Sequence, residues 1–144
     1  MHETDNEAAI LNYLLEPFEI RVQTLDRTLV DKVFALCDYL VGERIERNSR
    51  HIYDLPRLLT RVRLDDGLRE LVREVRADRK PHAMCYSAQD GVSVPEMLSR
   101  IVKTGIYRKD YETVTRAMTF KYVPYDDAII AIEKIIESGV FDTP

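Results

Sequence analysis

The sequence has few cysteines, and their placement excludes two kinds of small scaffold. Cys37 lies inside an apolar helical pattern and Cys85 in a loop-like segment, and these are the chain's 2 cysteines. A disulfide framework or a zinc site needs several cysteines, or cysteines with histidines, at close and regular spacing. We therefore expect a fold that is stabilised by its hydrophobic core in a reducing cytoplasm.

Long apolar runs and leader signals are also missing. No window approaches the roughly 18 consecutive apolar residues that identify a membrane-spanning helix. The opening segment, MHETDNEAAI, is acidic and polar and lacks the basic start and apolar centre of a secretion signal. The sequence therefore predicts a cytoplasmic protein that makes no contact with a membrane.

The composition is that of an ordinary globular domain. With 144 residues, of which 45% are hydrophobic and 32% charged, the chain can bury a core as a single domain, 1–144. A formal net charge of -4 argues against nucleic-acid binding over the whole surface. The segment from Glu43 to Lys80 nevertheless carries eleven Lys and Arg against eight Asp and Glu, so one face can be locally basic.

The spacing of apolar residues predicts a mainly α fold of about six helices with a small N-terminal strand element. Phe18, Ile20 and Val22 alternate with polar residues, which is typical of a half-exposed strand. From residue 26 to residue 144, apolar residues recur at three- and four-residue intervals, which predicts a helical domain. Because a lone strand leaves its backbone groups unpaired, we expect residues 1–25 to pair with strands from elsewhere.

Two of the predicted helices lie between Leu25 and Leu59. We expect Asp26 to cap the first helix and Gly42 to end it in the left-handed conformation, and the second to begin near residue 48 or 49. Lys32 falls at the border of the first apolar stripe, and Asp54 falls on the flank of the second. Such residues are most often a solvated surface ion pair, worth under about 1 kcal/mol.

The two segments RTLVDKVFALCDYL and RNSRHIYDLPRLL, which contain this lysine and this aspartate, carry a family resemblance. Together they resemble the C-terminal half of the AbiEii/AbiGii nucleotidyltransferase-like toxins, which include the MenT type. The resemblance extends weakly through YSAQDGVSV to the closing IIAIEKIIESGVFD. It implies a prokaryotic-type toxin-antitoxin or abortive-infection protein that handles a nucleotide.

The resemblance also implies a division of labour within the site. Lys32 and Asp54 would be the catalytic residues, and Arg27, Arg50 and His51 would contact the nucleotide or its phosphates. In the family, paired carboxylates after a Gly-Ser turn hold a divalent metal such as Mg²⁺, and the nucleoside triphosphate donates its nucleotidyl group. The acceptor is often the end of a transfer RNA, so RNA is an implied partner.

The sequence departs from the family pattern at two points. It contains no Gly-Ser dipeptide followed by paired carboxylates, so we assign no metal ligands and no cofactor to this chain alone. Pro56 follows the Asp-Leu pair and is expected to disturb the helix around Asp54. We therefore expect an inactive half that depends on a separately encoded N-terminal half or binds an antitoxin, with oligomerisation also open.

Two alternative functions remain open. Arg44 and His51 match the loose Arg-x(4-6)-His pattern of HEPN-type ribonucleases, which cut RNA without metal. A non-catalytic module for toxin-antitoxin interaction is the other alternative, so the sequence leaves open whether the chain is an enzyme. A further helix is predicted in the segment LDDGLRELVREVRADRK, with Asp65 or Asp66 as its cap and Leu68, Leu71, Val72 and Val75 as its buried stripe. Its other face carries arginines that form a solvated row or an RNA contact: Arg69, Arg73, Arg76 and Arg79.

Overall fold

The computed structural model describes residues 24–142, and their regular structure is entirely helical. The main helices are α2 (Leu25–Val41), α3 (Arg50–Leu59), α4 (Asp66–Arg79), α5 (Val94–Thr104) and α8 (Tyr125–Ser138). A sixth helical segment runs without a break through α6 (Arg108–Asp110), the π-helical turn η2 (Tyr111–Thr115) and α7 (Arg116–Met118). The expected mainly α fold of about six helices is confirmed, and the strand expected at residues 18–22 lies outside the described residues.

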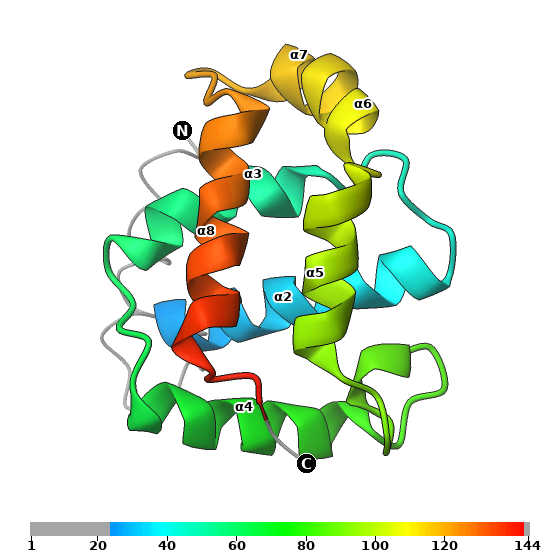
Figure 1. Cartoon of the computed structure of the whole chain (residues 1–144), viewed down its shortest axis with the longest axis vertical. Helices are drawn as coiled ribbons and strands as arrows, with labels where there is room; N and C mark the ends of the chain where they lie inside the picture. The colour runs from blue at the N-terminus through cyan, green and yellow to red at the C-terminus, as the bar shows by residue number, and fades with distance from the viewer. Residues whose placement is uncertain (1–23, 143–144) are drawn as a thin grey trace, which may run out of the picture.

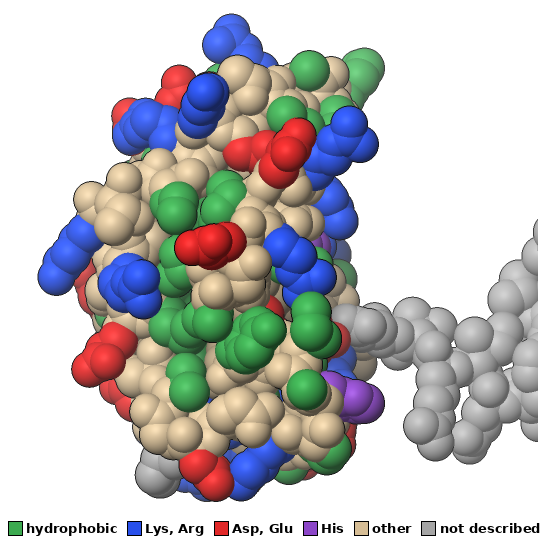
Figure 2. All heavy atoms as spheres, turned by 90° about the vertical axis from the view of Figure 1, so that its right-hand side faces the viewer, with side chains coloured by type: hydrophobic (Ala, Val, Ile, Leu, Met, Phe, Trp, Pro, Cys, Tyr) green, Lys and Arg blue, Asp and Glu red, His purple; other side chains and the backbone are tan. Residues whose placement is uncertain are grey.

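The helices are arranged around α2, which crosses the molecule near its middle. In Figure 1, α5 and α8 stand side by side in front of α2, with α4 along the lower edge and α6 and α7 at the top. Helix α3 contacts both α2 and α8. The α2–α3 connection, residues 42–49, runs along the right-hand edge, the face that is turned toward the viewer in Figure 2.

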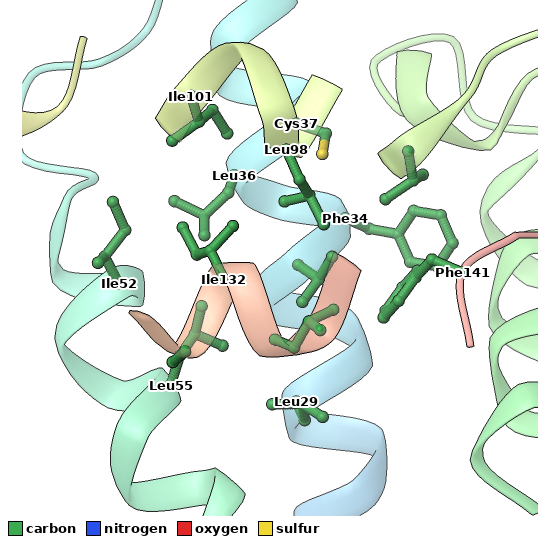
Figure 3. Close-up of a cluster of buried hydrophobic side chains, with 14 of the residues drawn as sticks. Leu29, Phe34, Leu36, Cys37, Ile52, Leu55, Leu98, Ile101, Ile132 and Phe141 are labelled. Carbon is green, nitrogen blue, oxygen red and sulfur yellow. The ribbon is translucent and has the colours of Figure 1, made fainter. Parts of the chain in front are cut away.

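The core is built on the apolar stripe of α2, as the helical period predicted. Figure 3 shows Leu36 of α2 between Leu98 of α5, Ile132 of α8 and Ile52 of α3, and these four side chains are fully buried. Burial of each large apolar side chain stabilises the fold by about 1.5–3 kcal/mol. This shared core packs α3 against α2 and brings polar residues of the two helices close to each other.

Several helix ends agree with the sequence, whereas α2 differs at both of its ends. Asp65 accepts a hydrogen bond from the Leu68 amide and caps α4, as expected. Helix α2 is capped by the Thr24 side chain, not by Asp26. The prediction that Gly42 would be left-handed is also wrong, because its φ is -80°. The chain instead reverses through Glu43 and Arg47, whose φ values are 55° and 66°.

No helix among residues 24–142 is both long and apolar enough to cross a membrane.

Candidate functional site

The structure brings Lys32 and Asp54 into direct contact. The Lys32 Nζ, from α2, lies 2.8 Å from the Asp54 Oδ2, from α3, and the two side chains are 22% and 40% exposed. Helix α3 continues through Pro56, so this proline does not prevent the contact. The pair is therefore an accessible ion pair on the surface, held over a buried α2–α3 interface.

Lys32 also lines a pocket of about 320 Å³ that follows one face of α2. Helices α2, α3 and α4 supply its walls, whose residues are Thr28, Asp31, Lys32, Ala35, His51 and Arg79. An amine in such a pocket can contact phosphate oxygens, and the neighbouring carboxylate can orient that amine. Lys32 thus connects the ion pair with a space where a ligand group can lie.

His51 contributes an uncharged ring to this pocket. Its imidazole stacks on the Tyr39 ring at a centroid distance of 5.7 Å and an interplanar angle of 16°. Both ring nitrogens are buried and have no hydrogen-bond partner among the described residues. Burial, helped by the nearby charges of Lys32 and Arg50, lowers the pKa of His51 to about 4. The ring is therefore neutral at pH 7 and adds no positive charge for a phosphate.

Arg27 and Arg50, the other predicted phosphate contacts, lie close to the pocket without lining it. Arg27 pairs with Asp31 at 3.5 Å and with Asp78 at 3.3 Å, across the junction of α2 and α4. Arg50 donates to the backbone carbonyl of Arg47 at the start of α3. Their roles toward a nucleotide stay predictions.

Arg79, which the sequence pattern placed in a row that is either solvated or in contact with RNA, lines the pocket. It is 21% exposed and pairs with Asp31 at 3.3 Å and with Asp38 at 3.2 Å. Its guanidinium lies over the Phe34 ring, 5.5 Å from the centroid. Arg76 turns inward over the same ring, whereas Arg73 stays exposed and pairs with Glu70. Arg76 and Arg79 share an apolar partner, Phe34 of α2, and Arg73 does not contact it. The spacing of residues along α4 does not reveal this partner.

The charges of the pocket are nearly balanced. The amine of Lys32 faces Asp54, and the guanidinium of Arg79 faces Asp31 and Asp38. In the part of the chain that the structure describes, no group of three or more His, Cys, Asp or Glu side chains could hold a metal ion. A triphosphate would therefore need further positive charge from outside these residues.

The comparisons with known proteins identify one family. The family model described as nucleotidyl transferase AbiEii toxin, type IV toxin-antitoxin system, matches residues 2–134. The match covers nearly the whole chain and includes both Lys32 and Asp54, whereas the segments that carry the resemblance in the sequence begin at Arg27. Neither the search of curated proteins nor the search of solved structures gave a match.

Proposed function

Because the chain belongs to the AbiEii family of nucleotidyl transferase toxins, we propose that Lys32 and Asp54 form the nucleotide-handling part of a nucleotidyl-transfer site. The observation that carries this proposal is the 2.8 Å contact of an accessible lysine and an accessible aspartate beside a polar pocket. A surface ion pair of this kind adds little to folding, so its position at a pocket favours a role toward a ligand.

Each side chain suits a different task. The Lys32 amine can bind a phosphate oxygen and stabilise the negative charge that develops there during transfer. Asp54 holds that amine in place and can accept a hydrogen bond from a nucleotide hydroxyl. Arg27, which pairs with the pocket residue Asp31, and Arg50, which adjoins the pocket residue His51, are the further candidates for phosphate contacts. The buried nitrogens of His51 leave it an uncharged ring in the pocket wall. These assignments rest on geometry and on the family resemblance together.

The residues that the structure describes do not form a metal site, and this limits what we propose for the chain alone. The sequence has no Gly-Ser turn with paired carboxylates, and the described residues hold no cluster of three ligands. We propose that the chain supplies the later, helical part of the family's site, and that carboxylates from a partner segment complete it. On this proposal the isolated chain binds a nucleoside triphosphate and does not transfer its nucleotidyl group.

The alternative hypothesis from the sequence, a metal-independent ribonuclease of the HEPN type, has less support from the structure. Such an enzyme needs a histidine that can exchange a proton with RNA near neutral pH. The nitrogens of His51 are buried and its pKa is about 4, while Arg44 lies over the Tyr39 ring, 5.6 Å from the centroid. RNA cleavage in EDTA that is lost in His51→Ala would favour the ribonuclease over the nucleotide site.

A binding experiment with a matched control tests the proposed function. We expect Lys32→Ala to weaken the binding of magnesium-loaded ATP, GTP, CTP or UTP at least about tenfold, because it removes the phosphate contact. Lys80→Ala is the control, since Lys80 also pairs with an aspartate, Asp90, at 2.7 Å and lies outside the pocket. Equal binding by the two variants would contradict the proposal.

A labelling assay tests the separate claim that the isolated chain is inactive. The chain is incubated with each radiolabelled nucleoside triphosphate, Mg²⁺ and total transfer RNA. We expect no labelled product from the chain alone and labelling only after a partner that supplies the metal carboxylates is added. Robust labelling by the isolated chain, lost in Lys32→Ala, would overturn the claim of inactivity.

A further inference from the structure

Helix α3, which carries Asp54, begins without a cap of its own. Ser49 precedes it in a helical conformation, with φ -67° and ψ -13°, and makes no side-chain capping bond. The first turn also contains no acidic residue. The first amides of a helix have no partner within the helix, and a negative charge near them is favourable. The start of α3 therefore has to be held from elsewhere in the molecule.

A distant carboxylate, Asp110 of α6, meets this start. Its Oδ1 accepts from the Arg47 amide at 2.8 Å, and its Oδ2 accepts from the Ser49 amide at 3.2 Å and the Ser49 hydroxyl at 2.6 Å. Arg47 has a φ of 66°, a left-handed conformation that is unfavourable for a residue with a side chain. Asp110 thus compensates for a strained turn and anchors the first residue before α3.

The π-helical turn η2 (Tyr111–Thr115) supplies a second contact to the same serine. In a π-helix residue i bonds residue i+5, so Asp110 and Thr115 lie one above the other, which they would not in an α-helix. The Thr115 hydroxyl lies 2.7 Å from the Ser49 hydroxyl. Ser49, Asp110 and Thr115 are all buried, with exposed fractions of 0%, 9% and 2%. The π-helical turn therefore brings Asp110 and Thr115 to the same hydroxyl group, that of Ser49.

We propose that Asp110, acting through Ser49 and Thr115, is a positioning residue that sets α3 so that Asp54 meets Lys32. The inference rests on the proposed function for its biological meaning, but its geometry can be tested without a nucleotide. Asp54 lies about one and a half helical turns after Ser49, so a displaced start of α3 moves it. The exposed pair is too weak to correct such a displacement itself.

The test follows the side-chain nitrogen of Lys32 by NMR in isotope-labelled protein, with Asp54→Asn as the reference for a broken pair. We expect Asp110→Asn, Ser49→Ala and Thr115→Val each to move the Lys32 Nζ signal toward its position in Asp54→Asn. Thr115→Ser keeps the hydroxyl, and we expect it to leave the signal unchanged. If Asp110→Asn does not fold, the Ser49 and Thr115 variants decide the question.

Ser87→Ala is the matched control for a general loss of stability. Ser87 is fully buried and donates to the buried Asp38 carboxylate at 2.6 Å, and Ser49 donates to Asp110 at the same distance. Ser87, however, lies in the loop that follows α4 and makes no such contact at the start of α3. We expect it to lower the urea midpoint and leave the Lys32 signal in place. An unmoved Lys32 signal in Ser49→Ala, or an equal shift in Ser87→Ala, would overturn the inference.

A second measurement separates this inference from the proposed function. Binding of magnesium-loaded ATP, GTP, CTP and UTP is measured on Ser49→Ala and on the unaltered chain. A moved Lys32 signal with weaker binding supports both proposals. A moved signal with unchanged binding supports the positioning role of Asp110 and contradicts the nucleotide site at Lys32 and Asp54.

Discussion

The aspartates of this protein work in two different settings. Asp38 and Asp110 are buried, and each accepts hydrogen bonds from a backbone amide and a serine hydroxyl at 2.6–3.2 Å. Asp54 is 40% exposed, and it forms an ion pair with the amine of Lys32. Carboxylates of the first kind hold segments of the chain together. A pair of the second kind contributes little to the fold and is available to a ligand.

The largest effect should come from removing a buried carboxylate. We expect Asp110→Ala to lower the free energy of unfolding by about 3 kcal/mol, because it leaves the amides of Arg47 and Ser49 and the Ser49 hydroxyl without their partner. Urea denaturation measures this change. A loss below about 1 kcal/mol would show that Asp110 contributes as little to stability as an exposed aspartate, and would contradict the difference between the two settings.

The next effect concerns His51 and pH. Its folded pKa of about 4 lies below its ordinary value of 6.5, so the unfolded chain takes up the proton first as the pH falls. The stability due to neutral His51 is present above pH 6.5 and is lost as the pH falls toward 4, by about 2 kcal/mol when the pH has reached about 5. Lys32 and Arg50 oppose its protonation, and Asp54 favours it.

Urea midpoints at several pH values between 7.5 and 5 check the sign of this dependence. We expect His51→Phe, which keeps an aromatic ring against Tyr39, to lose less stability over that range than the unaltered chain. Identical pH dependence in the two proteins would show that His51 is not held neutral.

A smaller effect is expected from the two buried serines. Ser49→Ala and Ser87→Ala each remove one hydroxyl donor to a buried carboxylate, which should cost about 1.5 kcal/mol in the free energy of unfolding. The two losses should be similar, because the hydroxyl-to-carboxylate distance is 2.6 Å in both cases. A much larger loss in only one variant would show that the two junctions are not equivalent.

The smallest effect on stability is expected at the exposed pair. We expect Lys32→Met and Asp54→Asn each to change the free energy of unfolding by less than about 1 kcal/mol, since solvent screens this contact. Urea denaturation curves at neutral pH measure this change in the free energy of unfolding. A loss of about 3 kcal/mol would mean that the pair is part of the fold, as Asp110 is.

The helices and many of their ends could be predicted from local sequence. The apolar period of α2 predicted its buried face, and Asp65, one of the two expected caps, caps the start of α4. These features depend on neighbours within a few residues, so the sequence carries them directly. Lys32 and Asp54 were singled out by the family resemblance, and the structure places them in contact.

The contacts between distant segments could not be predicted. Asp110 and Ser49 are 61 residues apart, and no local pattern marks the π-helical turn that aligns them. Arg79 belongs to a row of arginines along α4, and its partners Phe34, Asp31 and Asp38 all lie on another helix, α2. Such features follow from how the helices pack, which the period of a single helix does not determine.

Stability and nucleotide binding, measured together on Lys32→Met, test the central claim most directly. Dissociation constants for the four magnesium-loaded nucleoside triphosphates and a urea denaturation curve are obtained from the same protein preparation. We predict binding weakened at least about tenfold with a change in unfolding free energy below about 1 kcal/mol. Unchanged binding, or a loss of binding that only follows a loss of folded protein, would contradict the account.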